Sequence, residues 1–363
     1  MNRRKISVLC LAVLWGALTL GLWLGPRQQI SEGERRPLAQ FPELTGKAVF
    51  SGRFMEAFAD FTLDQFPLRD GFRTLKAAFH TYALGQRDSN GIYIAQGHAA
   101  QLNYPLDRDS LDHAANRLNY LYNTYLEDSR VVMAIVPDKG CYLAEASGRP
   151  ALDYGAMVTY FRETLPWAQV LDLRDTLSLS SYYRTDTHWR QECLLPSAEV
   201  LCESLGVSAP KGEDFTPVTL AEPFPGVYAG QAALPLEADS LTMLTSPLLE
   251  NCTVYNWETD QEGTVYDLAK AEGSDLYEVF LSGPRSLLTI HNPAGQPGKE
   301  LIVFRDSFGS AMVPLLVEDY ETVTLVDIRY LQSAMLNKYL DFSGQDVLIL
   351  YSTLVLNNSE TMK

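Results

Sequence analysis

The stretch that most constrains the fold of this chain is residues 301–316, LIVFRDSFGSAMVPLL. Its first four residues form a short apolar run, which is typical of a buried β-strand and too short for a helix. The chain then turns through R-D-S-F-G into what reads as the start of a helix. Ser307 in this turn lies on a rigid element, and unpaired N–H groups at a helix start can stabilise a developing negative charge. The plainer alternative is that Ser307 or Asp306 caps the helix, because both residue types favour that position.

A second motif, YYRTDTHW at residues 182–189, favours a catalytic role for Ser307. If this segment is extended, Asp186 and His188 lie two residues apart and share one face. A carboxylate beside an imidazole holds the ring in one tautomer and stabilises its protonated form, as a general base requires. We therefore interpret Ser307 as a candidate nucleophile, His188 as its base and Asp186 as the residue that orients His188.

The combination of D-T-H-W at residues 186–189 and R-D-S-F-G at residues 305–309 resembles the DHHW family. This family lies within the wider SGNH-hydrolase-like class, which includes bacterial alginate O-acetylation proteins. The usual pattern has two histidines, but Thr187 occupies the first position here, so only Asp186 and His188 carry over. The usual Gly-Asp-Ser is also replaced by Arg-Asp-Ser. The resemblance extends to three further segments: residues 34–38, 64–70 and 90–94.

The N-terminus determines the expected compartment. Three basic residues at positions 3–5 precede an uncharged stretch, residues 6–26, in which about 20 residues are apolar or small, enough to span a bilayer. A cleaved signal peptide has a shorter apolar core and a small-x-small cleavage site, which this stretch lacks, so we favour an uncleaved anchor. Basic charge before the span keeps the N-terminus cytoplasmic. We predict a single-pass plasma-membrane protein with an extracytoplasmic C-terminal domain.

These signals divide the chain into four predicted parts: cytoplasmic residues 1–5, a transmembrane anchor at 6–25, a juxtamembrane linker at 26–50, and an extracytoplasmic domain at 51–363. Aromatic residues at helical spacing between positions 54 and 82 predict two core helices separated by Pro67. Proline-rich residues 206–300 predict an irregular insertion, which forms either long loops or a substrate-facing lid. A hairpin of residues 277–281 and 286–291 is expected within it.

The predicted fold class is α/β. Strand and helix patterns alternate at residues 130–205 and again at 301–351, which predicts right-handed βαβ units. We expect an SGNH-hydrolase-like, mostly parallel sheet covered by helices, with a β-containing insertion and an N-terminal transmembrane helix. Sites in such sheets form at the carboxyl ends of strands. Arg329 falls there and could hold a carbonyl oxygen or a sugar carboxylate, although a salt bridge to Asp327 explains it equally well.

Composition excludes several classes of partner and cofactor. The chain has 45 acidic and 29 basic residues and a net charge of −16, so nucleic acid is not expected as a partner. No Cys-x-x-Cys pair or Cys/His cluster occurs, so neither a metal site nor another cofactor is expected. Cys193 and Cys202 are too far apart along one predicted helix for a disulfide, whereas a bridge involving Cys141 or Cys252 stays open.

Two functions of different classes follow. The resemblance implies a membrane-anchored serine acyl-transfer enzyme, an O-acetyltransferase or acetylesterase that acts on a cell-envelope or exopolysaccharide glycan, with a possible membrane acyl-transfer partner. The alternative is a non-catalytic, membrane-tethered envelope protein that binds glycan or assembles a complex. Metal-dependent hydrolysis lacks the clustered ligands that it needs. Whether the chain is an enzyme therefore depends on whether Ser307, His188 and Asp186 meet.

Overall fold

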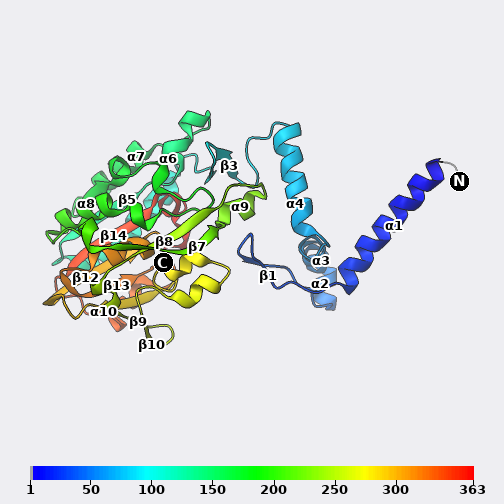
Figure 1. Ribbon diagram of the computed structural model, residues 1–363. Helices are drawn as coiled ribbons and strands as arrows, with labels where there is room; N and C mark the ends of the chain where they lie inside the picture. The colour runs from blue at the N-terminus through cyan, green and yellow to red at the C-terminus, as the bar shows by residue number, and fades with distance from the viewer. Residues whose placement is uncertain (1–2) are drawn as a thin grey trace. The chain divides into compact units, whose positions relative to one another are not determined.

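The computed structural model describes residues 3–363, and its contacts divide the chain into two units (Figure 1). Unit 1 holds the residues up to Gly91 together with Val227–Pro235, and unit 2 holds Ile92–Gly226 and Leu236–Lys363. The predicted cytoplasmic segment, residues 1–5, lies partly outside the described residues. The domain boundaries expected from the sequence stay predictions.

Unit 1 is built mainly of helices. Its first helix, α1 (Arg3–Leu24), is the one described helix that is long and apolar enough to cross a membrane, and a signal sequence would have the same length and composition. The other helices and strands of the unit are α2 (Gly46–Phe50), α3 (Arg53–Asp64), α4 (Arg69–Ala78), its continuation η1 (Phe79–Ala83), α9 (Val227–Ala232), and the short pair β1 (Ile30–Ser31) and β2 (Arg36–Pro37). Pro67 lies in the break between α3 and α4, as predicted.

Two of the sequence segments that carry the family resemblance meet in unit 1. Asp64 at the end of α3 accepts two hydrogen bonds from Arg36, at 2.9 and 2.7 Å, and one from the Ala39 N–H. The hydrogen bonds from Arg36 hold the pKa of Asp64 at about 2. Arg69 pairs with both Glu34 and Asp64. These ion pairs fasten the chain that follows α1 to the junction of α3 and α4.

The predicted aromatic core of α3 and α4 forms only in part. Phe58 and Phe61 pack around Trp23, with ring centroids 6.3 and 6.5 Å away, and Phe54 contacts Phe41. The second half of the stripe does not enter a core: four of its side chains are 44–77% exposed, namely Phe72, Leu75, Phe79 and Tyr82. This part of the prediction is wrong: Phe72 contacts the ring of Phe66, with centroids 5.5 Å apart, but all four side chains stay largely in contact with solvent.

Unit 2 is a mixed α/β domain with an eight-stranded sheet in the order β10-β9-β11-β13-β12-β14-β5-β6. The five strands from β13 to β6 are parallel, and the three strands on the other side of β13 are antiparallel. The bounds are β5 (Val131–Val136), β6 (Gln169–Asp172), β9 (Thr253–Asn256), β10 (Gln261–Gly263), β11 (Leu287–His291), β12 (Gln296–Arg305), β13 (Tyr320–Val326) and β14 (Asp346–Ser352).

Helices cover both faces of this sheet. The α-helices of unit 2 are α5 (Arg108–Leu121), α6 (Gly140–Leu143), α7 (Tyr154–Thr164), α8 (Leu195–Leu205), α10 (Pro247–Asn251), α11 (Gly309–Met312) and α12 (Thr353–Leu356), and its other strands are the pairs β3 (Ile92–Ala95) with β4 (His98–Gln101) and β7 (Thr216–Phe224) with β8 (Asp239–Thr245). α5 and α7 share one apolar cluster with the sheet, and α8 and α11 share the other. All six residues of β5 are buried, as a central parallel strand requires.

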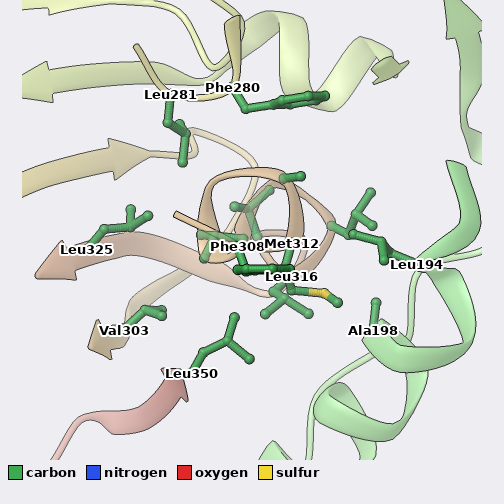
Figure 2. Packing of buried hydrophobic residues seen from close by; sticks show 14 of the residues in the cluster. Leu194, Ala198, Phe280, Leu281, Val303, Phe308, Met312, Leu316, Leu325 and Leu350 are labelled. Atoms are coloured by element: carbon green, nitrogen blue, oxygen red, sulfur yellow. The ribbon is translucent and has the colours of Figure 1, made fainter. Parts of the chain in front are cut away.

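Figure 2 shows how the helix after Ser307 enters the core. Phe308, Met312 and Leu316 are at most 2% exposed, and they lie among apolar side chains of the sheet and of α8. The labelled neighbours are Leu194, Ala198, Phe280, Leu281, Val303, Leu325 and Leu350. The backbone that carries Ser307 is therefore held from below by a packed core.

The hairpin predicted within residues 206–300 does not form. Tyr277 lies in a single 3₁₀ turn, and β11 pairs instead with β9 on one side and β13 on the other. Residues 253–291 thus extend the main sheet by three strands. All five cysteines of the chain, which lie within the described residues, are free thiols, so no bridge forms to Cys141 or Cys252.

Candidate active site

Ser307 lies directly after the central strand β12, at the carboxyl end of the parallel strands. The side chain that closes this turn is that of Asp306: its Oδ1 accepts the Phe308 N–H at 3.0 Å and its Oδ2 accepts the Ser352 N–H at 2.8 Å. Ser307 is half-buried, whereas its neighbours on both sides are buried. Because Asp306 closes the turn, the Ser307 hydroxyl is left available for another partner.

Arg305 and Gly309 hold the turn from beneath. Arg305 is fully buried, and its Nη1 donates to the Asp306 carbonyl and to the Ser310 hydroxyl, at 3.3 and 3.2 Å. A Cβ atom at Gly309 would lie 2.7 Å from the Cβ of Arg305, so a side chain there would displace the arginine. The tight turn that presents Ser307 therefore depends on a glycine two residues later.

The D-T-H-W segment is a tight bend rather than the extended segment that we expected. Tyr182 and Trp189 form an isolated bridge, and the Tyr183 N–H donates to the His188 carbonyl at 3.2 Å, so the residues between them loop out. Asp186 Oδ1 accepts the His188 N–H at 3.1 Å, and it accepts Nδ1–H of the same ring at 2.7 Å. The two side chains meet because the aspartate closes this bend.

Two side chains that follow the bend tie it to the helix after Ser307. Trp189 Nε1 donates to the Phe308 carbonyl at 3.1 Å, and Gln191 Nε2 donates to the Ala311 carbonyl at 2.9 Å. These bonds join segments that are about 120 residues apart in the sequence. Nothing in the sequence around Gln191 indicates that its side chain makes this bond.

His188 joins the two segments at the centre of the site. Its Nε2 lies 2.8 Å from Ser307 Oγ, and its Nδ1 lies 2.7 Å from Asp186 Oδ1. Asp186 is fully buried, His188 is 8% exposed, and the ring stacks on Tyr277 with centroids 3.8 Å apart. Since Nδ1–H donates to the carboxylate, Nε2 carries the lone pair and faces the serine hydroxyl. The structure thus brings three of the four candidate residues into one hydrogen-bonded chain.

Residues 172–326 match the DHHW protein family, and this range contains all three of these residues.

The resemblance expected from the sequence is confirmed by this match and by the solved structures with the same fold. A DHHW family protein from Eubacterium siraeum is 20% identical, with a TM-score of 0.60 over 76% of this chain and 95% of that chain. PatB1 from Bacillus cereus is 15% identical, with a TM-score of 0.60 over 75% and 98% of the two chains. PatB1 with a sulfonyl adduct is 14% identical, with a TM-score of 0.57 over 73% and 95%.

At these identities the solved structures show the fold alone, and they confirm the predicted α/β class with a mostly parallel sheet covered by helices. No curated protein matches the sequence of this chain.

Lys139, which was not expected from the sequence, stabilises the bend through two backbone carbonyls. It is 2% exposed, and its Nζ donates to the Tyr183 carbonyl at 2.9 Å and more weakly to the Arg184 carbonyl at 3.4 Å. Burial lowers the pKa of Lys139 to about 7, against the opposing effect of nearby carboxylates such as Asp186 and Asp239. This ammonium group lies where it can influence the charge of the site.

Arg329, the fourth candidate, forms an ion pair with Asp327. Its Nε and Nη2 donate to the two carboxylate oxygens of Asp327, at 2.9 and 2.7 Å, and Asp327 is fully buried. This is the salt bridge that the sequence analysis offered as the plainer alternative. The matched family range ends before Arg329.

Two cavities in the described chain lie away from these four residues. One, of about 1170 Å³, lies in unit 1, and the other, of about 460 Å³, lies beside residues 101–109 of unit 2. The described chain also has no group of three or more His, Cys, Asp or Glu side chains placed to hold a metal ion. The chemistry that the site offers is that of a half-buried serine and a buried histidine.

Proposed function

We propose that this chain is a serine acyl-transfer enzyme. The observation that carries the proposal is the position of His188, which contacts Ser307 through one ring nitrogen and the buried Asp186 through the other. A nucleophile within hydrogen-bond reach of a base that is itself oriented by a third group is the arrangement that activates a hydroxyl. A mechanism based on arginine, on lysine or on a metal ion would not require a histidine that contacts both a serine and an aspartate.

In the proposed reaction, His188 Nε2 takes the proton of Ser307 as Oγ attacks an ester carbonyl. The new C–O bond leaves negative charge on the carbonyl oxygen, and the Ser307 N–H, which has no backbone acceptor among the described residues, can donate to it. Protonated His188 returns the proton to the leaving alcohol, which gives an acyl-serine. Asp186 stabilises the imidazolium during both steps.

The acyl-serine is then cleaved by a second hydroxyl. Water as the acceptor makes the protein an esterase, and a sugar hydroxyl makes it a transferase; in either case His188 removes the acceptor proton and passes it to Ser307. We propose acetyl as the group and a cell-envelope or exopolysaccharide glycan as the acceptor, because the family resemblance implies them. A membrane partner that supplies the acyl group is part of this proposal.

We further propose that α1 is an uncleaved anchor that keeps unit 2 outside the plasma membrane. The support is the length of α1, 22 residues, its apolar composition and the basic residues at its start. Arg329 has a secondary role in the proposal. Two of its guanidinium nitrogens are held by Asp327, which leaves Nη1 to meet a substrate oxygen at the strand edge.

The test is turnover of p-nitrophenyl acetate by the full-length protein in detergent. We expect acetate release that is lost in Ser307→Ala and in His188→Ala. Ser180→Ala, which removes an exposed hydroxyl elsewhere in unit 2, should leave the rate unchanged. If folded wild-type protein releases no acetate from this ester or from an acetylated glycan, the non-catalytic envelope protein becomes the better account.

A further inference from the structure

The exposed apolar side chains of α4 form a regular stripe. Five large apolar residues recur every three or four positions: Leu68, the residue before α4, and then Phe72, Leu75, Phe79 and Tyr82 on α4 and η1. Their exposed fractions run from 44% to 77%. At this spacing the last four occupy one side of α4 and η1, which together form a helix of about 22 Å. An apolar strip of this length and regularity marks an interaction surface rather than scattered surface residues.

A basic stripe runs beside the apolar one. Arg69, Arg73, Lys76 and His80 each follow an apolar stripe residue by one position, so they lie on the adjoining face of the same helix. Arg69 and Arg73 are paired with Glu34 and Asp70, whereas Lys76 is exposed and makes no ion pair among the described residues. A short helix with an aromatic and leucine face beside a basic face is the type that lies in the interfacial plane of a bilayer.

The start of α4 is held at the level where α1 ends. A Cβ atom at Gly21 would lie 2.8 Å from the ring of Pro67, which precedes the first residue of the apolar stripe. Trp23, at the end of α1, packs on the Phe58 and Phe61 rings of α3, and tryptophans are enriched at membrane interfaces. Arg27, the first charged residue after α1, donates to the Leu22 carbonyl and lies 4.7 Å above the Phe61 ring. If α1 spans the membrane, α4 therefore starts at the membrane surface.

We propose that α4 and η1 lie in the outer interface of the bilayer, with the apolar stripe against acyl chains and Lys76 toward anionic headgroups. Arg69 and Arg73 keep the helix from crossing the hydrocarbon, because buried charges are costly there. The helix provides a second membrane contact, continuous with α1, and limits how far the chain after α1 can move from the bilayer. The inference rests on membrane anchoring by α1 and is independent of the chemistry at Ser307.

The experiment uses full-length protein in vesicles of phosphatidylethanolamine and phosphatidylglycerol, with the photoreactive residue benzoylphenylalanine in place of Phe72 or of Phe79. The matched control carries the same group at Thr74, an exposed position of α4 outside the stripe. After illumination, mass spectrometry identifies what each position has captured. We expect lipid adducts at Phe72 and Phe79 and loss of that signal at Thr74.

Three results would overturn the proposal: an adduct to a second copy of the chain, an adduct to another segment of the same chain, or no adduct above the Thr74 background. Lys76→Glu tests the headgroup contact, and it should lower the lipid adduct at Phe79 in vesicles that contain phosphatidylglycerol but not in vesicles without it. An equal yield in both would remove that part of the proposal. Carbonate extraction of each variant verifies anchoring separately, and p-nitrophenyl acetate turnover verifies the state of the Ser307 site.

Discussion

At the scale of single residues, Asp186 carries two tasks with one oxygen. Its Oδ1 accepts both the backbone N–H and the ring N–H of His188, so it shapes the bend and selects the tautomer. Asp186→Asn retains an oxygen for the backbone but no charge for the imidazolium. We expect a folded protein whose kcat falls roughly 10³- to 10⁴-fold. Steady-state kinetics with p-nitrophenyl acetate measure this fall, and a variant with near wild-type kcat would show that Asp186 is structural only.

Lys139 predicts a pH dependence of stability. Burial lowers its pKa from 10.5 to about 7, so between these values the unfolded chain binds more protons than the folded protein. The free-energy cost of burying this amine is therefore absent above about pH 10.5, grows as the pH is lowered and is complete below about pH 7. The protein is accordingly more stable at the high end of this interval.

Thermal unfolding of wild type and Lys139→Met at pH 7.5 and pH 9.5 tests this prediction. The wild type should gain stability relative to Lys139→Met at the higher pH. The exposed control Lys338→Met should follow the wild type at both values. Parallel pH dependence of wild type and Lys139→Met would mean that the buried amine does not titrate in this interval.

At the scale of elements, the site depends on bonds between the bend and the helix after Ser307. Trp189→Phe keeps an aromatic ring in the core but removes the N–H that donates to the Phe308 carbonyl. We expect a loss of about 1 kcal/mol in stability and a fall in kcat of roughly 10- to 100-fold, because small displacements of reacting groups are costly. Trp257→Phe is the matched control, since it removes a similar bond to Thr289 on an exposed surface. Equal effects of both variants on kcat would contradict this role of Trp189.

The same elements show what could be predicted from the sequence. The apolar runs at residues 131–136 and 301–304 predicted the central strands correctly, because they are buried on both faces. The pairing of Asp186 with His188 was also correct, although the bend replaced the extended geometry. The hairpin at residues 277–291 was wrong, because β11 finds its partners in β9 and β13, which are not its neighbours in sequence. Such non-local pairing leaves no short-range signal.

At the scale of the whole molecule, the exposed apolar face of α4 is the clearest departure from expectation. Helical spacing of aromatic residues correctly predicted an apolar face, but spacing alone does not specify what covers that face. Phe61 meets Trp23 and is buried, whereas Phe79 on the next helix meets no core residue and stays 56% exposed. Lys139 and Gln191 were missed for a related reason, since their partners are distant backbone carbonyls.

Membrane anchoring by α1 predicts the behaviour of the whole chain in cells. The full-length protein should stay with the membrane after carbonate extraction. N-terminal sequencing of the mature protein should find residues that precede α1. Replacing Leu11 and Leu14 within α1 by Asp should release the protein into the aqueous phase, whereas the same pair of changes to Ala should not. Cleavage after Gly25 in the wild type would show that α1 is a signal peptide.

The account rests on Ser307 being an activated nucleophile, and covalent labelling with a sulfonyl fluoride tests this without knowledge of the natural donor. Intact mass followed by peptide mapping should find one adduct per chain, on Ser307. The adduct should be absent in Ser307→Ala, and its rate of formation should fall by orders of magnitude in His188→Ala. No adduct on folded wild-type protein, or an adduct at Ser307 that forms equally fast in His188→Ala, would contradict the proposed chemistry.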